Sequence, residues 1–131
     1  MSQVPNDPLA ILLVEDESGI MGLLRRLMRD LARAYEIVPC TNGRIALDEL
    51  GRRQVAMVIT DYRMPELDGL ELTRHVKAAR PHLPVLMISA YAYPDLQRRA
   101  MEAGVDRFIG KPFTLELLEE TIQQLLLPTA P

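Results

Sequence analysis

The sequence has 131 residues, of which 48% are hydrophobic and 25% are charged, and this is the composition of one globular domain with a normal core. Its formal net charge of -3 gives no field that would attract nucleic acid or an anionic membrane, and no apolar run approaches the roughly 20 residues that cross a bilayer. The single cysteine, Cys40, excludes an internal disulfide framework, and the N-terminus lacks the basic and apolar regions of a signal peptide. We therefore expect a cytoplasmic protein that binds neither nucleic acid nor membranes directly.

Both ends of the sequence are expected to be tails around one domain. Residues 1–8 contain two prolines, and residues 128–131 contain two more directly after an apolar helical pattern. Between them, residues 9–127 alternate short apolar runs with helical patterns. We therefore predict a single domain over 9–127, followed by a tail or the start of a linker.

Five short apolar runs are predicted to be strands, and three of them are nearly continuous in aliphatic residues. That pattern is typical of strands buried on both faces of a parallel sheet. The five runs are 9–14, 35–38, 55–59, 85–88 and 105–109. Pro39 indicates that the second strand lies at an edge of the sheet, because proline cannot donate a hydrogen bond into a central strand.

The first predicted helix has the clearest pattern. Its apolar residues recur at i, i+3, i+4, i+7, i+8 and i+11, and arginines line the opposite side. The apolar residues are Ile20, Leu23, Leu24, Leu27, Met28 and Leu31, and the arginines are Arg25, Arg29 and Arg33. An arginine stripe of this kind usually faces solvent.

Four further helices are predicted. The last runs from Leu115 to Leu126, with Thr114 as its N-cap. The others are expected near 42–51, 69–79 and 94–103, and the residues near their starts are Asn42, Gly69 and Pro94. The helix near 94–103 has a weak apolar stripe, so we expect it to be the loosest.

Five strands that alternate with five helices predict an α/β domain of the (βα)5 type. Its parallel five-stranded sheet is expected to be doubly wound in the flavodoxin-like order 2-1-3-4-5, with helices on both faces. In such sheets, ligands bind beyond the carboxyl ends of the strands.

Polar side chains stand at the ends of four of the five predicted strands. They are Glu15, Asp16 and Glu17 after the first strand, Asp61 after the third, Ser89 after the fourth and Lys111 after the fifth. Each has an ordinary structural explanation by itself, as a helix cap, a turn residue or a solvated charge. Their joint placement at one edge of the sheet favours a functional site.

The chemistry of these groups indicates a magnesium site for a phosphoryl group. Neighbouring carboxylates repel one another unless a cation compensates their charge. A shallow cluster of carboxylate oxygens suits Mg²⁺, which keeps several waters and takes one or two carboxylates from the protein. Lys111 and the Ser89 hydroxyl can contact phosphoryl oxygens, and Asp61 is central enough to be the nucleophile that forms an acyl phosphate.

These residues resemble the receiver domain of two-component response regulators, over about residues 9–127. The resemblance rests on four segments that occur in the family order and spacing. They are Ile11-Leu12-Leu13-Val14-Glu15-Asp16-Glu17, Thr60-Asp61-Tyr62-Arg63-Met64-Pro65-Glu66-Leu67-Asp68-Gly69, Ser89-Ala90 and Lys111-Pro112-Phe113. The match is highly specific because it includes every polar position at the strand ends.

The resemblance implies that Asp61 accepts a phosphoryl group from a phosphohistidine on a sensor histidine kinase or a histidine phosphotransfer protein. It also implies that Asp16 binds Mg²⁺ directly and Glu15 binds it through water, with Mn²⁺ as an alternative metal. Asp61 itself and the backbone carbonyl of Arg63 complete the implied metal ligands.

The remaining implied roles concern the switch. Ser89 corresponds to the switch hydroxyl, Lys111 to the phosphate-binding lysine and Phe108 to the aromatic residue that turns inward on activation. The peptide bond before Pro112 is usually cis in the family. Three positions differ from the commonest family residues, since Glu15 replaces aspartate, Ser89 replaces threonine and Phe108 replaces tyrosine.

The implied activation is a population shift driven by the charge that phosphorylation adds to Asp61. Movement of Ser89 toward the phosphoryl group leaves space for Phe108. The face formed by 94–103, 105–109 and the last helix then changes shape and binds a downstream protein or a fused output domain. Homodimerisation through the two helices of this face is left open, and the arginine stripe of the first helix is a second surface that could guide a kinase.

Two large side chains are expected at the mouth of the site. Arg63 lies two residues after the acceptor and Tyr91 two residues after the switch hydroxyl. Together they could hinder the attack of water on the acyl phosphate.

Two other functions compete with this interpretation. A small phosphohydrolase with an aspartyl-phosphate intermediate would carry a second aspartate two residues after its nucleophile, where this sequence has Arg63. A receiver-like interaction module that is never phosphorylated would have no need for the complete set of acidic residues and Lys111. We therefore expect a protein that reacts only on its own Asp61 and is not otherwise an enzyme. The sequence leaves open the kinase, the output, the lifetime of the phosphorylated state and whether the chain is part of a longer protein.

Overall fold

The computed structural model describes residues 9–17, 22, 24–26, 29 and 33–126. Within them, five parallel strands form one sheet in the order β2-β1-β3-β4-β5, which confirms the predicted doubly wound α/β fold. The strands are β1 (Ala10–Val14), β2 (Glu36–Cys40), β3 (Val55–Asp61), β4 (Val85–Ser89) and β5 (Arg107–Gly110). The helices with assigned bounds are α2 (Gly43–Arg52), α3 (Gly69–Ala79), α4 (Pro94–Ala103) and α5 (Leu115–Leu126).

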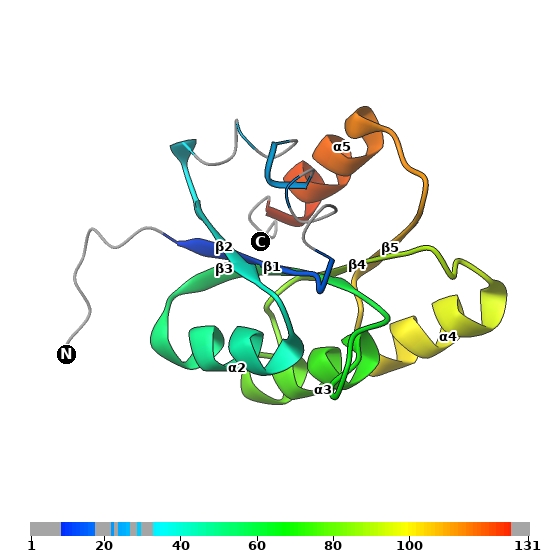
Figure 1. Cartoon of the computed structure of the whole chain (residues 1–131), viewed down its shortest axis with the longest axis horizontal. Helices are drawn as coiled ribbons and strands as arrows, with labels where there is room; N and C mark the ends of the chain where they lie inside the picture. Colours follow the sequence, from blue (N-terminus) through cyan, green and yellow to red (C-terminus); the bar gives the residue numbers. More distant parts are fainter. Residues whose placement is uncertain (1–8, 18–21, 23, 27–28, 30–32, 127–131) are drawn as a thin grey trace.

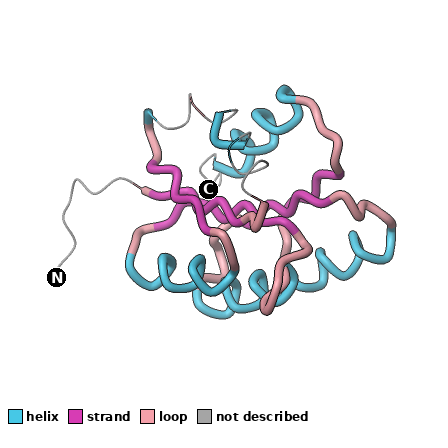
Figure 2. The backbone as a smooth tube through the Cα atoms, viewed as in Figure 1, coloured by secondary structure: helices cyan, strands magenta, loops and turns pink. Residues whose placement is uncertain are grey.

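The sheet lies between two layers of helices. Helices α2, α3 and α4 cover one face and α5 covers the other (Figures 1 and 2). Most of the predicted first helix lies outside the described residues, although 22 and 24–26 are helical. Leu24 is buried and Arg25, Arg29 and Arg33 are exposed, as the predicted pattern requires. None of the helices in the described ranges combines the length and the apolar character needed to cross a membrane.

The aliphatic runs are continuous because the central strands are buried on both faces. In β1, Leu12 and Val14 belong to the core under α2, α3 and α4. Their neighbours Ile11 and Leu13 belong to the core under α5. Successive side chains of a strand point to opposite faces, so a strand between two helix layers needs apolar residues at every position.

The edge position predicted for β2 is confirmed. Among the described residues this strand pairs only with β1, and Pro39 lies opposite Leu13. A proline without an N–H is tolerated there because one side of the strand has no sheet partner in the described part of the chain. The strand extends to Cys40, two residues beyond the predicted run.

Strand β5 begins at Arg107 and not at Val105, because hydrogen bonds to Lys77 and Val85 hold Asp106. Its carboxylate accepts hydrogen bonds from the Val85 backbone N–H and from the Lys77 ammonium, both at 2.8 Å. The Asp106 backbone N–H in turn donates to the Val85 carbonyl at 2.9 Å. These bonds fix the start of β5 at the end of the sheet opposite to the carboxyl ends of the strands.

The helix starts agree with the capping residues of the sequence. The Asn42 side chain accepts a hydrogen bond from the Ile45 N–H at 2.8 Å, and the Thr114 hydroxyl accepts one from the Leu117 N–H at 3.1 Å. Helix α3 begins at Gly69, and its N-cap is Asp68, which forms a reciprocal capping box with Glu71. Helix α4 begins at Pro94 and has no side-chain cap.

Gly69 brings the start of α3 directly against the end of β3. Its backbone N–H donates to the Tyr62 carbonyl at 2.8 Å. A Cβ atom at this position would lie 2.2 Å from the Asp61 carbonyl oxygen and 3.0 Å from the Tyr62 Cα. Because both neighbours are backbone atoms, any side chain here must displace the loop that follows Asp61.

We predict that Gly69→Ala lowers the free energy of unfolding by about 1–3 kcal/mol, the usual cost of forcing an extra methyl group into a packed site. Gly51→Ala is the matched control, since Gly51 lies in α2 and a Cβ atom added there would have no neighbour within 4 Å. That control should stabilise the protein by about 0.5–1 kcal/mol, because alanine favours a helix more than glycine does. Urea denaturation of both variants measures this, and equal effects would contradict the proposed clash.

Candidate functional site

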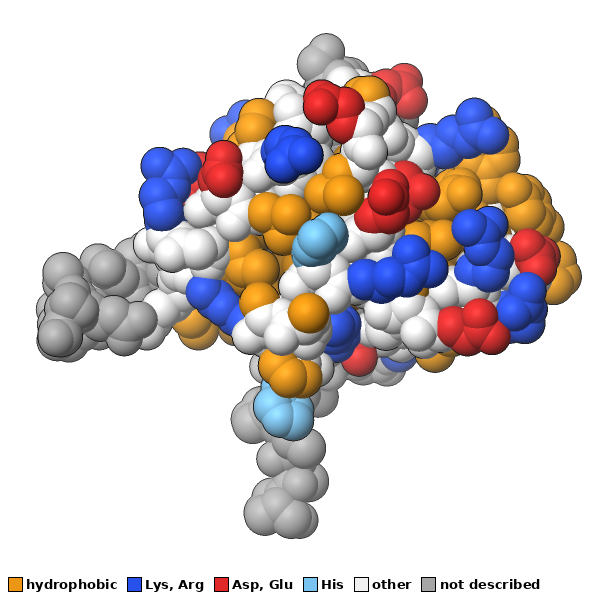
Figure 3. Space-filling model, turned by 90° about the horizontal axis from the view of Figure 1, so that it is seen from below, with side chains coloured by type: hydrophobic (Ala, Val, Ile, Leu, Met, Phe, Trp, Pro, Cys, Tyr) orange, Lys and Arg blue, Asp and Glu red, His pale blue; other side chains and the backbone are white. Residues whose placement is uncertain are grey.

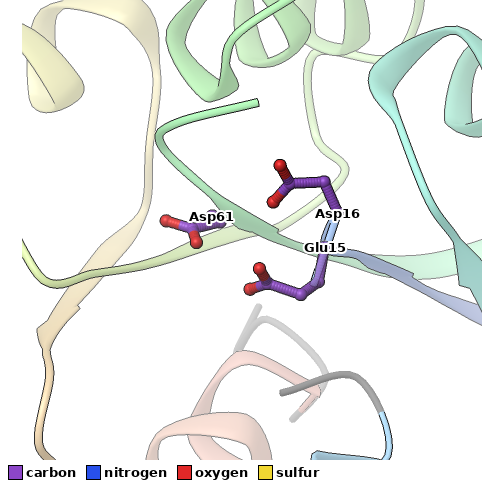
Figure 4. A group of neighbouring side chains, drawn as sticks. All are labelled: Glu15, Asp16 and Asp61. Carbon is purple, nitrogen blue, oxygen red and sulfur yellow. The ribbon is translucent and has the colours of Figure 1, made fainter. Parts of the chain in front are cut away.

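Three carboxylates meet where β1 and β3 end. The two strands are neighbours, with Val14 opposite Thr60, so Glu15 and Asp16 emerge beside Asp61. One carboxylate oxygen from each of the three residues lies within 4.8 Å of the others. The three side chains extend from the two strand ends toward the same space (Figure 4). The predicted acidic cluster is therefore present in the fold.

Lys111 reaches this cluster from the end of β5. Its ammonium nitrogen lies 3.2 Å from Asp61 Oδ2 and 3.6 Å from Glu15 Oε1. The Lys111 backbone N–H donates to the Ser89 carbonyl at 2.8 Å, so the residue is anchored to the end of β4. The Lys111–Pro112 peptide bond is cis, as the resemblance implied.

The three carboxylates differ in their exposure to solvent. Glu15 is 2% exposed, Asp61 is half-buried and Asp16 is exposed. The pKa of Glu15 is raised to about 7, first by burial and then by the nearby Asp61 carboxylate, while Lys111 opposes the shift. The site thus holds more negative charge than its one lysine compensates.

The second carboxylate oxygen of Asp61, Oδ1, also accepts a hydrogen bond. The backbone N–H of Tyr62 donates to Asp61 Oδ1 at 2.6 Å, while Lys111 contacts Oδ2. No sequence signal marks this backbone donor, because any residue type after Asp61 other than proline offers the same N–H. The two contacts hold the carboxylate in one orientation at the mouth of the site.

Ser89 and Phe108 lie on the next two strands. Ser89 is the last residue of β4, one position beyond the pairing of Ile88 with Asp61, and it is fully buried. Its hydroxyl oxygen accepts a hydrogen bond from the Tyr91 N–H at 3.0 Å. Phe108 is half-buried and packs against the core under α2, α3 and α4.

The side chains of Arg63 and Tyr91 contact each other across the site. The guanidinium carbon of Arg63 lies 4.7 Å from the centroid of the Tyr91 ring. A cation–π contact of this exposed kind contributes about 0.5–1 kcal/mol. The sequence placed both residues at the mouth but did not predict that they would touch.

The loop after β3 also borders a hollow of about 440 Å³ that is lined by Asp16, Tyr62, Arg63, Met64, Pro65 and Asp68.

The residues present fit a hard divalent cation. The cluster offers oxygen atoms from three carboxylates, one of them exposed, and Mg²⁺ prefers such ligands together with several waters. A bound cation would also counter the burial and the Asp61 charge that together raise the pKa of Glu15. The chemistry of the donor set therefore agrees with Mg²⁺ binding.

Comparison with known proteins gives one consistent family. The family model of the response regulator receiver domain matches residues 11–123. The chemotaxis protein CheY of Pseudomonas aeruginosa is 36% identical over 117 residues, which cover 88% of this chain and 94% of that protein. The transcriptional regulatory protein GlrR of Escherichia coli is 34% identical over 95% of this chain, but the match spans only 28% of GlrR.

A solved structure adds information about the site. The receiver domain of the sensor histidine kinase PA1611 from Pseudomonas aeruginosa PAO1 has a TM-score of 0.81 and 25% sequence identity, with 92% of this chain and 98% of that chain covered. That structure is described as having a magnesium ion coordinated in the active site cleft.

The raised pKa of Glu15 predicts a pH-dependent stability in the absence of divalent cations. Between its ordinary value of 4.5 and about 7, the folded protein holds a proton on Glu15 that the unfolded chain releases. The contribution of Glu15 to the free energy of unfolding therefore falls as the pH rises through this range, by about 3 kcal/mol in total.

Urea denaturation with a chelator, from pH 4.5 to pH 8, should show this loss in the wild type relative to Glu15→Gln. Glu120→Gln is the control, because Glu120 is exposed on α5. If the wild type and Glu15→Gln curves ran parallel over the whole range, the assignment to Glu15 would be wrong.

Proposed function

Because the chain belongs to the response regulator receiver domains of two-component systems, we propose that it is a phosphorylation-dependent switch that accepts a phosphoryl group on Asp61. The donor is a phosphohistidine on a sensor histidine kinase or a histidine phosphotransfer protein. The single observation that carries the proposal is the position of Asp61, whose carboxylate stands in the acidic cluster with the Lys111 ammonium 3.2 Å away. We assign the receiver domain to residues 9–127.

The chemistry is a phosphoryl transfer to a carboxylate. A carboxylate oxygen of Asp61 forms a bond to phosphorus while the bond between phosphorus and the histidine nitrogen breaks, and the nitrogen keeps the electron pair. Lys111 pairs with a phosphoryl oxygen, and its anchored backbone keeps the ammonium at the site. The Ser89 hydroxyl donates to another phosphoryl oxygen.

The acidic cluster is proposed to hold Mg²⁺, with Mn²⁺ as an alternative. Asp16 and Asp61 bind directly, Glu15 binds through water and the backbone carbonyl of Arg63 is the further ligand. When bound, the metal neutralises charge on the transferring phosphoryl group. The magnesium ion in the PA1611 receiver structure supports this assignment, as does the oxygen-rich donor set.

Phosphorylation is proposed to change the face formed by α4, β5 and α5. The acyl phosphate adds roughly 1.5–2 negative charges at neutral pH, by analogy with other phosphorylated side chains. Ser89 moves toward this charge, and Phe108 turns into the space behind it. The altered face binds a downstream protein or an output domain, and it is also the surface on which a homodimer would form. The match to a small fraction of GlrR and to nearly all of CheY supports both kinds of output.

We predict that wild-type protein incubated with acetyl phosphate and Mg²⁺ gains a single phosphoryl adduct, and that Asp61→Asn abolishes it. Intact mass spectrometry measures the adduct. Asp68→Asn is the matched control, because Asp68 lies in the same loop but serves as the N-cap of α3, a role that asparagine also fills. That control should be phosphorylated like the wild type.

An adduct of equal yield in Asp61→Asn would overturn the assignment of the acceptor. Sustained turnover of added phosphate esters by the wild type would instead favour the phosphohydrolase function. Removal of Mg²⁺ with a chelator should prevent the adduct in every variant.

We also predict that Arg63→Ala/Tyr91→Ala shortens the lifetime of the phosphorylated protein. The contact between the two side chains covers the mouth of the site and hinders the approach of water. Loss of about 1.4 kcal/mol of this protection corresponds to roughly tenfold faster hydrolysis. The decay of the adduct after removal of acetyl phosphate measures the rate, and an unchanged rate would show that the pair does not shield the site.

A further inference from the structure

A second hollow, of about 530 Å³, lies where β2 begins. It is lined by Arg25, Arg26 and Arg29 and by Tyr35, Glu36 and Ile37. The other end of β2 is the end near the phosphorylation site, because the Cys40 carbonyl accepts a hydrogen bond from the Glu15 N–H at 3.0 Å. Glu36 and Cys40 are the two ends of the strand and stand roughly 13 Å apart along it. The hollow is therefore separate from the acidic cluster.

The three arginines lie next to one another along the chain. Arg25 and Arg26 are helical, and the Arg29 backbone N–H donates to the Arg26 carbonyl at 3.3 Å. Residues three and four positions apart share one side of a helical turn, so Arg29 is a neighbour of both other arginines. Like charges at this spacing repel one another and weaken the helix. An anion bound between the guanidinium groups would remove this repulsion.

The carboxylate that lines the hollow is paired with a different arginine. Glu36 Oε1 lies 2.8 Å from Arg53 Nη1, and Arg53 also pairs with Glu49 at 2.6 Å. Within the described ranges, no carboxylate forms an ion pair with the three arginines of the hollow. On the face of α2, α3 and α4, by contrast, acidic and basic side chains lie side by side (Figure 3), and Arg98 pairs with two carboxylates of its own helix. The hollow thus concentrates positive charge on a protein whose formal net charge is -3.

Gly22 also lines the hollow and keeps it open. A glycine inside a helix costs stability relative to alanine, because glycine loses more conformational freedom on folding. Gly22 is helical and its φ is not positive, and among the described residues a Cβ atom added there would meet no atom within 4 Å. Neither packing nor backbone conformation therefore requires glycine at this position. The absent side chain instead adds to the room inside the hollow.

The lining of the hollow fits a phosphorylated small molecule. A guanidinium group binds two phosphoryl oxygens through paired N–H donors, which an ammonium group cannot do. Tyr35 and Ile37 are half-buried and pack against the core under α5, so they supply a fixed and partly apolar wall. The volume lies in the range of sites that hold small ligands. A flat docking surface for a protein would gain nothing from a hollow that glycine keeps open.

We propose that this hollow binds a pyrophosphate group, either as inorganic pyrophosphate or as part of a nucleoside diphosphate. The three guanidinium charges match the charge of two linked phosphoryl groups better than that of one. In a nucleotide, the sugar or the base lies against Tyr35 and Ile37. Because the hollow is separate from Asp61, this inference does not depend on the proposed function.

NMR of the ¹⁵N-labelled full chain tests the proposal, in a buffer of constant ionic strength with EDTA so that no divalent cation competes for the ligand. Sodium pyrophosphate should shift the amide signals of Gly22, Arg26 and Tyr35 in a saturable way, while those of Asp61 and Lys111 stay in place. Orthophosphate should bind about tenfold more weakly, because it makes fewer charge-assisted hydrogen bonds. Tighter binding of ADP than of pyrophosphate would identify a nucleotide as the ligand, and equal binding would identify the free anion.

Variants separate the hollow from a general attraction of anions. Gly22→Leu should abolish the shifts, because leucine fills the hollow without removing a charge, and urea denaturation should find this variant at least as stable as the wild type. Arg26→Gln/Arg29→Gln should weaken pyrophosphate binding about tenfold or more. Arg26→Lys/Arg29→Lys should restore only part of it. Arg74→Gln removes one charge from an exposed position of α3 and should bind pyrophosphate as the wild type does.

Three outcomes would overturn the inference. The first is the absence of saturable shifts at Gly22 and Tyr35. The second is binding of equal strength in the wild type, Gly22→Leu and Arg26→Gln/Arg29→Gln, because the anion would then bind elsewhere. The third is a hexaglutamate peptide that binds these arginines more tightly than pyrophosphate does, a result that would assign them to an acidic protein surface. Each of these results would leave the phosphorylation of Asp61 untouched.

Discussion

The properties of the site depend on three carboxylates that the sheet holds close together although they repel one another. Glu15, Asp16 and Asp61 stand within 4.8 Å of one another, and Glu15 is buried. Lys111 supplies one positive charge, which leaves an excess of negative charge in a partly dehydrated place. The site therefore favours a divalent cation, and the same excess makes it sensitive to each charge that is added or removed.

The central strands of the sheet are packed more firmly than helix α4. The strands that carry the acidic residues are buried on both faces, so Asp61 and Glu15 have little freedom to move apart. Helix α4 buries only Leu96, Ala100 and Ala103, and it begins without a side-chain cap. Two of these three residues are alanines, whose burial yields little stabilisation.

Much of the fold follows from the order and pattern of the residues. Parallel strands must place their carboxyl ends along one edge, so the convergence of Glu15, Asp61 and Lys111 was predictable once the five runs were recognised. The edge position of β2 followed from Pro39, and the caps Asn42 and Thr114 followed from their residue types. These features depend on local preference or on topology alone.

Features that depend on long-range side-chain contacts were not predictable in the same way. The start of β5 was misplaced because the Asp106 carboxylate binds Lys77 and the Val85 N–H, residues 29 and 21 positions away. The stacking of Arg63 on Tyr91 joins two loops, and no periodic pattern signals it. The cap at Asp68 is different, because Glu71, three residues later, is a local signal of a capping box, and the prediction that named Gly69 near the helix start overlooked it.

The geometry around Asp61 agrees with the proposal that this carboxylate accepts a phosphoryl group without catalysing repeated turnover. Repeated hydrolysis needs a group that delivers a proton to each leaving group and a second that activates water. Two residues after Asp61 the chain has Arg63, whose side chain turns to Tyr91 and cannot act as a general acid. The Lys111 ammonium is paired with carboxylates, and its proposed role is to stabilise a phosphoryl group on Asp61. On the proposed function, a nucleophile at Asp61 with a neutralising cation beside it and the Arg63–Tyr91 pair at the mouth would keep the phosphoryl group for a limited time, which is the property that a signalling switch requires.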